Sequence, residues 1–142
     1  EYGADARRVR AGLQRNDFGS PLLLRAAARG CHVEMMELLV RHGAPVDAVN
    51  INGETALHFC AGNKQAIYLI DHGADVNATD TRGRTPMHDA AATGNLAVAK
   101  ALINRGAKIN ARDVFEQTPL DDVGREGMRE MRMLLLLHGG HE

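Results

Sequence analysis

The chain of 142 residues repeats itself at intervals of 30 to 33 residues, and this rhythm constrains the fold more than any other feature. Thr55, Thr85 and Thr118 open the similar phrases TALHFCA, TPMHDAA and TPLDDVG, at intervals of 30 and 33 residues. The glycines of the phrases HGAPVDA, HGADVNA, RGAKINA and HGGHE follow at intervals of 30, 33 and 33 residues. Two sets of markers with the same rhythm indicate an internal repeat in which each copy forms one structural unit.

Each copy predicts a pair of helices. Thr85 suits a helix N-cap, and Pro86 suits the first helical position, where no backbone N–H is needed. The alanines that follow favour a helix and allow another helix to approach closely. Gly94 then breaks the helix, and the run 95–106 places its apolar residues mainly on one face of a second helix. We therefore expect helix, tight turn, antiparallel helix and projecting turn in each unit.

One such pair cannot bury its apolar side, whereas stacked pairs cover each other. We therefore expect an all-α solenoid of about four helix-turn-helix units with β-turn-like projecting loops. No run approaches the roughly 18 apolar residues of a membrane span, so membrane insertion is not expected. The net charge of −1 gives no reason to expect a nucleic acid as partner.

The phrase GRTPMHDAA at 83–91, the turn glycine Gly94 and the phrase GADVNA at 73–78 together resemble the ankyrin repeat. The resemblance covers about residues 16–140. It implies an ankyrin repeat domain over 16–142, with repeats at 16–48, 49–78, 79–111 and 112–140 and an N-terminal capping helix or remnant of a preceding repeat at 1–15. Because no methionine begins the chain, we expect it to be part of a longer protein.

Several residues depart from the family pattern. The first repeat is one residue longer than the pattern, which leaves its alignment ambiguous by one position. The second lacks three residues between Ala61 and Ile67, which predicts a shortened helix or turn. In the fourth, Glu116 replaces the usual turn glycine and Asp121 replaces the usual histidine, which predicts a strained or altered turn. Leu137 stands where a polar residue is normal, so it is either an apolar residue on a capping helix or covered by a following segment.

The seven histidines invite a metal hypothesis. His42, His72 and His138 occupy equivalent positions, but packed helices lie about 8–10 Å apart, too far to share a zinc ion at about 2.0–2.1 Å per bond. For His58 and His88, the resemblance implies a hydrogen bond to the backbone of the neighbouring turn. Phosphate-loop, serine-hydrolase and metalloprotease motifs are also missing from the sequence. We therefore expect no catalytic residue, no metal and no cofactor.

Cysteine usage and the first residues bear on location. Cys31 and Cys60 form no CxxC motif, and reduced thiols are a better interpretation than a disulfide. The segment EYGADARRVR lacks the apolar core of a signal peptide. We therefore expect an intracellular protein, either cytoplasmic or nuclear.

In ankyrin proteins the projecting turns and first helices form a concave surface that binds partners, usually proteins. The resemblance implies partner-binding roles for the turn residues Phe18, Ile51, Asn52, Glu54, Arg82, Arg84, Val114, Phe115 and Gln117, and for the first-helix residues Arg25, Phe59, Asp89, Asp122 and Arg125. The four apolar turn residues stand out, because an apolar side chain at a turn tip is poorly placed to reach the core. The alternative is that each folds back over its neighbour.

Two functions remain open. The first is a non-enzymatic module that binds a partner protein or peptide on the concave face and turns. The second is a regulatory or substrate-recruiting segment of a larger enzyme, such as a ligase, kinase, acyltransferase or chaperone ATPase, with flanking domains of its own chain as partners. The neighbouring sequence would distinguish them, because fold alone does not name function.

Asn77 is a further candidate site. Its surroundings resemble substrates of the asparaginyl hydroxylase that modifies ankyrin repeats, with Leu69 eight residues earlier and Asp75 and Val76 between. The resemblance implies hydroxylation at Asn77. The alternative is a turn asparagine with a purely structural role.

Overall fold

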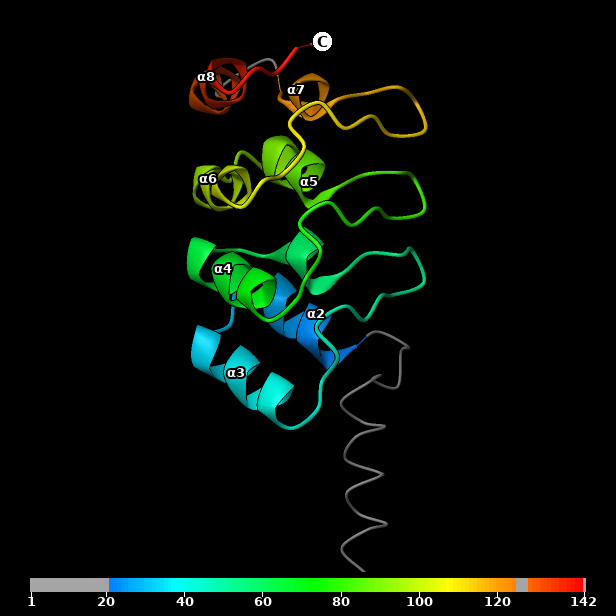
Figure 1. Cartoon of the computed structure of the whole chain (residues 1–142), viewed down its shortest axis with the longest axis vertical. Coiled ribbons are helices and arrows are strands. Elements are labelled where there is room, and N and C mark those ends of the chain that lie inside the picture. Colours follow the sequence, from blue (N-terminus) through cyan, green and yellow to red (C-terminus); the bar gives the residue numbers. More distant parts are fainter. Residues whose placement is uncertain (1–20, 125–127, 142) are drawn as a thin grey trace, which may run out of the picture.

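The computed structural model describes residues 21–124 and 128–141. Within these ranges every regular element is helical: α2 (Leu22–Ala28), α3 (Val33–Arg41), the 3-10 helix η1 (Ala56–Phe59), α4 (Asn63–Asp71), α5 (Pro86–Thr93), α6 (Leu96–Asn104), α7 (Pro119–Asp122) and α8 (Arg129–Leu137). Consecutive elements pair and the pairs stack along one axis, so the predicted all-α solenoid is confirmed (Figure 1). The predicted capping segment 1–15 lies outside the described residues.

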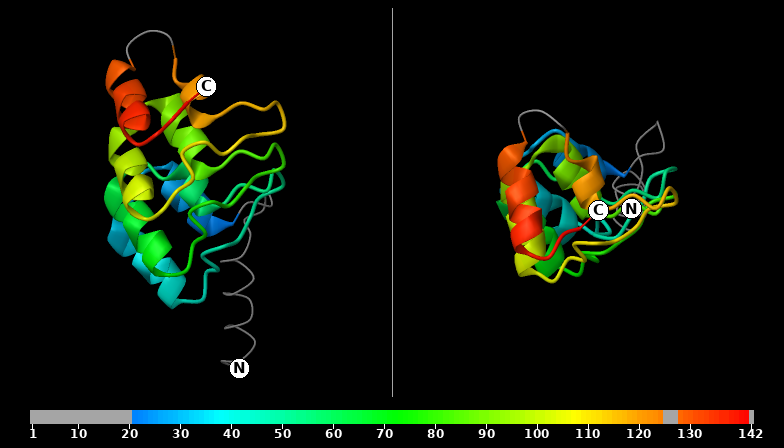
Figure 2. Two further views of the ribbon diagram at one scale, coloured as in Figure 1. Left: turned by 45° about the horizontal axis from the view of Figure 1, so that its top comes forward. Right: turned by 90° about the horizontal axis from the view of Figure 1, so that it is seen from above.

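The stack has two layers. In the first layer α2, η1, α5 and α7 pack on one another in sequence, and in the second α3 contacts α4 and α4 contacts α6 (Figure 1). The projecting turns all leave on the same side of the first layer, as the view from above shows (Figure 2). Between the layers lies a core of fully buried side chains, which includes Leu23, Leu57, Met87 and Leu120 from the first layer and Met36, Leu69, Leu102 and Leu135 from the second.

Helix α5 shows why these residues form these elements. Thr85 is its N-cap and Pro86 its first residue, as predicted. Gly94 ends the helix in the left-handed region at φ 69°, where a glycine has no Cβ to clash. Ala90 and Ala91 are buried, and such small side chains favour close packing of α5 on its neighbours η1, α6 and α7.

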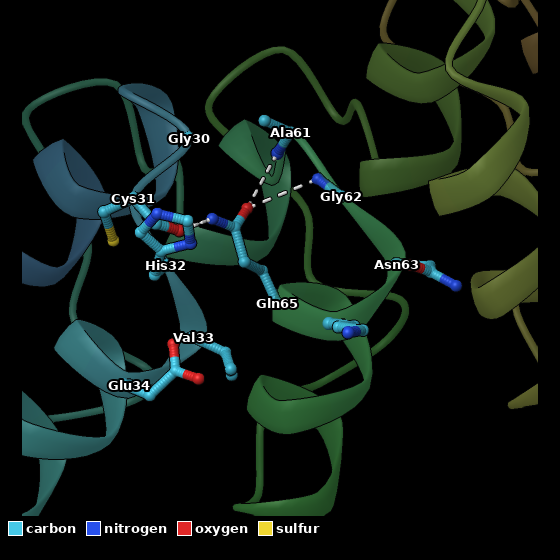
Figure 3. A pocket seen from close by; sticks show the side chains of 10 residues that line it. Gly30, Cys31, His32, Val33, Glu34, Ala61, Gly62, Asn63 and Gln65 are labelled. Atoms are coloured by element: carbon cyan, nitrogen blue, oxygen red, sulfur yellow. Dashed lines mark hydrogen bonds between the residues drawn. The ribbon is translucent and has the colours of Figure 1, made fainter.

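The second unit is short because its first helix is short. Helix η1 has four residues where α5 has eight, which confirms the predicted shortening. A hollow of about 320 Å³ lies beside the helix-connecting turns of the first two units (Figure 3). Gln65 bridges these turns: its Oε1 accepts the N–H groups of Ala61 (3.1 Å) and Gly62 (3.3 Å), and its Nε2 donates to the carbonyl of Cys31 (Figure 3).

The outer face of α8 is open. Met133, Leu136 and Leu137 are 53%, 48% and 76% exposed, whereas Met131 and Leu135 on the same helix are buried. Leu137 therefore points away from the core in the part of the chain that the structure describes.

The projecting turns form a ladder. Asn50, Asp80 and Asp113 open successive turns, and each side-chain Oδ1 accepts backbone N–H groups two and four residues further on. Neighbouring turns are joined by backbone hydrogen bonds of 2.9 Å, from Thr81 N–H to the carbonyl of Asn52 and from Val114 N–H to the carbonyl of Arg82. The carboxamide or carboxylate thus shapes each turn, and the backbone bonds hold the turns in register.

The ladder depends on glycine where one turn approaches the next. Gly53 has φ 72°, and a Cβ on it would lie 3.2 Å from the backbone nitrogen of Thr81. Gly83 has φ 76°, and a Cβ on it would lie 3.3 Å from the Cα of Asp113. Glu116 takes this position in the last turn with φ 62°, the one positive φ at a non-glycine residue in the described ranges. The predicted strain at Glu116 is therefore confirmed, and a further turn could not approach this one as closely.

Replacing Glu116 with glycine should stabilise the fold by about 0.5–1 kcal/mol. Relief of the left-handed strain, about 1–2 kcal/mol, exceeds the entropy cost of a new glycine. Urea denaturation would measure the difference. Glu116→Ala is the matched control, because it also removes the exposed ion pair with Arg112 but keeps the Cβ, and it should give no gain. An equal gain for both variants would show that backbone strain is not the cause.

Candidate functional site

Two buried histidines join the first helices to the turns. The Nδ1 of His88 accepts the backbone N–H of Thr85 (3.0 Å), and its Nε2 lies 3.0 Å from the carbonyl oxygen of Gln117 in the next turn. His58 repeats this arrangement one unit earlier, with Nε2 3.1 Å from the carbonyl of Arg84. A backbone N–H only donates and a carbonyl only accepts, so Nδ1 is the acceptor and Nε2 carries the proton. The predicted structural role of both histidines is confirmed.

In the fourth unit Asp121 replaces the histidine and keeps only the hydrogen bonds to its own capping threonine. Its Oδ2 accepts the backbone N–H of Thr118 (2.7 Å) and the hydroxyl of the same residue (2.9 Å). These hydrogen bonds favour the charged form and lower the pKa of Asp121. A carboxylate has no N–H group, so Asp121 holds its own helix start but cannot donate to a following turn.

The other histidines and the two cysteines of the described ranges lie in ordinary structural surroundings. Each Nδ1 of His42, His72 and His138 lies 2.7–2.8 Å from the carbonyl four residues earlier in its own helix. No group of three or more His, Cys, Asp and Glu that could hold a metal ion occurs in residues 21–124 and 128–141. Burial raises the pKa of the Cys60 thiol to about 12 and also raises that of Cys31, so neither thiol offers a reactive thiolate at neutral pH.

Four predicted site residues fall into one row along the first layer, here called the first-helix row. Phe59, Asp89 and Asp122 each lie four residues after a capping threonine, and Arg25 lies four residues after Pro21, the N-cap of α2. All four side chains are half-buried. Read along the stack, the row presents a cation, an aromatic ring and two carboxylates.

Arg84 joins two members of this row. Its guanidinium lies 3.1 Å from Asp122, 3.5 Å from Asp89 and 3.9 Å from Asp113. The sequence suggested a charge at a turn tip, but the side chain is only 17% exposed and folds against the first helices. The structure thus brings together one guanidinium and three carboxylates from α5, α7 and the last turn.

This cluster leaves acceptor capacity unused. The Oδ2 atoms of Asp89 and Asp122 are buried and accept no hydrogen bond from the described residues. The Oδ2 of Asp122 does lie 3.1 Å from Nη1 of Arg84, an ion-pair distance without hydrogen-bond geometry. Burial is the main cause that raises the pKa of Asp89.

The apolar turn tips are open to solvent. Ile51, Val114 and Phe115 are 89%, 62% and 70% exposed, so they do not fold back over their neighbours. Val49, which sequence reasoning missed, is 53% exposed beside the first of these tips. Its position next to Asn50, the residue that opens the turn, was the signal that could have found it.

The remaining predicted site residues lie on the turns or outside the described ranges. Asn52, Arg82 and Gln117 are exposed on the turns. Glu54 is half-buried and accepts a hydrogen bond from Asn50 Nδ2 (2.8 Å). Phe18 and Arg125 lie outside the described residues.

Asn77 has a structural role. Its Oδ1 accepts the backbone N–H of Lys108 in the following unit (2.8 Å), and the equivalent Asn110 accepts that of His141 (3.0 Å). Hydroxylation of Asn77 stays a prediction from the sequence.

The repeat matches a known protein family. A family model described as ankyrin repeats, in three copies, matches residues 4–80 and 23–113. Together these matches span more than half of the chain. In the described ranges, none of the helices has both the length and the apolar character needed to cross a membrane.

His88→Ala should lower the free energy of unfolding by about 2–4 kcal/mol. It would leave the N–H of Thr85 without its partner, take one of two donors from the carbonyl of Gln117, which keeps the N–H of Asp113, and open a cavity. Thermal or urea denaturation would measure this change in the free energy of unfolding. His72→Ala serves as control: this side chain is exposed and bonds only within its own helix, so its loss should cost less than about 1 kcal/mol. Similar losses for both would contradict the bridging role.

Arg84→Met should lower the free energy of unfolding by about 1–2 kcal/mol at pH 7, because three carboxylates lose their cation. The loss should shrink towards pH 4. Since burial raises the pKa of Asp89 above 3.8, the folded state keeps that proton to a higher pH than the unfolded state does. Protonation of Asp89 therefore stabilises the folded state below pH 3.8, and this contribution is lost as the pH rises through the raised pKa. A protonated Asp89 has no charge for Arg84 to neutralise, so removal of Arg84 costs less at low pH.

Urea titrations at both pH values would check this behaviour. The exposed Arg82 on the same turn gives the control, and Arg82→Met should change stability by less than about 0.5 kcal/mol at either pH. A loss for Arg84→Met that stays the same or grows on acidification would refute the electrostatic explanation.

Proposed function

The chain belongs to the ankyrin repeat family, and we propose that it is a protein-binding module with no enzymatic activity of its own. Ankyrin repeats generally mediate protein–protein interactions. In this chain the binding surface consists of the turn tips and the first-helix row. The partner is another protein or a peptide segment, and neither nucleic acid nor membrane insertion is part of the proposal.

The observation that carries the proposal is the exposure of large apolar side chains at the turn tips. Ile51 and Phe115 are 89% and 70% exposed although they stand on turns held by Asx hydrogen bonds and backbone pairing. Exposed apolar side chains on a rigid scaffold favour binding, because little conformational entropy is lost when a partner covers them. Charged side chains beside them in the first-helix row supply specificity.

The end of the ladder supports the same surface. The Cβ of Glu116 would hold a further turn farther away than Gly53 and Gly83 hold theirs, and Asp121 has no donor for it. Val114 and Phe115 are therefore less closely covered by a further turn than the tips of the earlier turns are. Free thiols at Cys31 and Cys60 support the further proposal of an intracellular location.

A second candidate function is a regulatory or substrate-recruiting segment of a larger enzyme. The observation that favours it is the apolar outer side of α8, with Met133, Leu136 and Leu137 exposed. A flanking domain of the same protein would cover these side chains.

The variant Ile51→Ala Phe115→Ala tests the first proposal. Affinity capture of partner proteins, quantified by mass spectrometry, should show at least a roughly tenfold loss of specifically bound protein, since exposed anchors of this kind dominate binding energy. The melting temperature should change by less than about 2 °C, because neither side chain contributes to the core.

The variant Met133→Ala Leu137→Ala is the matched control, because it removes a similar exposed apolar area from α8, in the second layer and away from the projecting turns. Binding should survive in this variant. Loss of binding in the α8 variant alone would favour the second candidate function, and loss in neither variant would contradict the proposed tips.

A further inference from the structure

We propose that the first-helix row binds an extended peptide segment in which one apolar residue is followed by basic residues at intervals of about three positions. An acidic residue about three positions before the apolar one would complete the segment. This inference rests on the proposed function and specifies the chemistry of the partner. The acidic residue of the peptide would face Arg25 and its apolar residue would face Phe59. Its two basic residues would face Asp89 and Asp122.

The spacing follows from the geometry of the stack. Arg25, Phe59, Asp89 and Asp122 stand at the same position on four elements that pack on one another in sequence. Packed helices lie about 8–10 Å apart, and an extended chain in the polyproline II conformation advances about 3.1 Å per residue with three residues per turn. A peptide that runs along the stack in this conformation therefore presents every third side chain to the row, about one to each element.

The apolar position is a hollow beside Phe59. It has a volume of about 160 Å³ and lies between the first helices of the second and third units, where η1 is short. Cys60, Ala90 and Val98 line it together with the aromatic ring of Phe59. Most of the wall is apolar, so burial of an aliphatic side chain there is favourable.

The site for the basic residues of the peptide adjoins that hollow and is rich in carboxylates. Asp89 lines both it and a second hollow of about 320 Å³, whose other charged residues are Glu54, Asp80, Arg82 and Arg84. With the neighbouring carboxylates of Asp113 and Asp122, this region holds five carboxylates and two guanidinium groups, a formal charge of −3.

This charge imbalance selects the sign of the ligand. Arg84 already pairs with its three neighbours, yet the Oδ2 atoms of Asp89 and Asp122 accept no hydrogen bond from the described residues. A lysine or arginine of the partner would supply the missing positive charge beside the exposed part of these side chains, which is 28% for Asp89 and 12% for Asp122. An acidic side chain would be repelled at this end of the row.

The opposite end of the row carries the opposite charge. Arg25 is half-exposed on α2 and pairs with no carboxylate in the part of the chain that the structure describes. With a cation at one end and carboxylates at the other, the row has electrostatic polarity. A peptide of matching polarity binds in one direction along the stack.

Selection from phage-displayed random twelve-residue peptides tests the inference on the whole chain. The selected sequences should share an apolar residue with lysine or arginine about three and six positions after it. A fluorescent synthetic copy of one selected peptide would then be titrated by anisotropy. Asp89→Asn Asp122→Asn should weaken its binding about tenfold, since each lost charge pair is worth a few-fold.

Two controls make the result specific. Asp47→Asn Glu130→Gln removes two exposed carboxylates away from the row and should change affinity less than about twofold. A peptide with its basic residues replaced by glutamine should bind the native chain and Asp89→Asn Asp122→Asn equally. On the native chain alone, the glutamine peptide should bind more weakly than the original peptide. This comparison tests the role of the basic residues even if Asp89→Asn Asp122→Asn folds poorly.

Three outcomes would overturn the inference: selected peptides without the basic pattern, equal affinity for Asp89→Asn Asp122→Asn and the native chain, or no selected peptide at all. None of these decides the proposed function, which stands or falls with partner capture by the Ile51 and Phe115 tips. A module that captures partners through its tips but shows no preference for basic peptides would keep the function and lose this inference.

Discussion

The stack depends on one interaction, the bridge that a buried histidine makes between its own helix start and the next projecting turn. His88 accepts a hydrogen bond from Thr85 through Nδ1 and reaches the carbonyl of Gln117 through Nε2. An imidazole can do both because one ring nitrogen accepts while the other donates. The first helices and the turns are thereby fixed relative to each other, and this relation gives the binding surface its shape.

The fourth unit shows the consequence of losing part of this bridge. Asp121 reproduces the contact with Thr118 but has no N–H to extend to another turn. Glu116 places a Cβ where glycine elsewhere lets the next turn approach. Both changes affect the outward side of the same turn, which also presents Val114 and Phe115 to solvent. The turn that carries these two changes thus also carries exposed apolar side chains.

Stability and recognition share residues at Arg84. Its guanidinium holds α5 and α7 together through Asp89 and Asp122, and the same carboxylates belong to the first-helix row. Because the cluster has more carboxylates than cations, ion pairing inside the protein leaves a net negative surface. A partner with positive charge therefore adds to an existing arrangement and does not need to create one.

Local features of this chain and the stacking of its units could be predicted, whereas the ion pairs between side chains of different units could not. Thr85, Pro86 and Gly94 predicted the ends of α5, because caps and breaks act over a few residues. Arg84 looked like an exposed tip residue, because its partner Asp122 lies 38 residues away and meets it only in the stack. The sequence by itself determined the helical units, their stacking and the apolar tips, since periodicity and turn chemistry encode them. Only the tertiary structure decided which charges neutralise each other and where hollows open, since both depend on side chains of separate units meeting within a few ångströms.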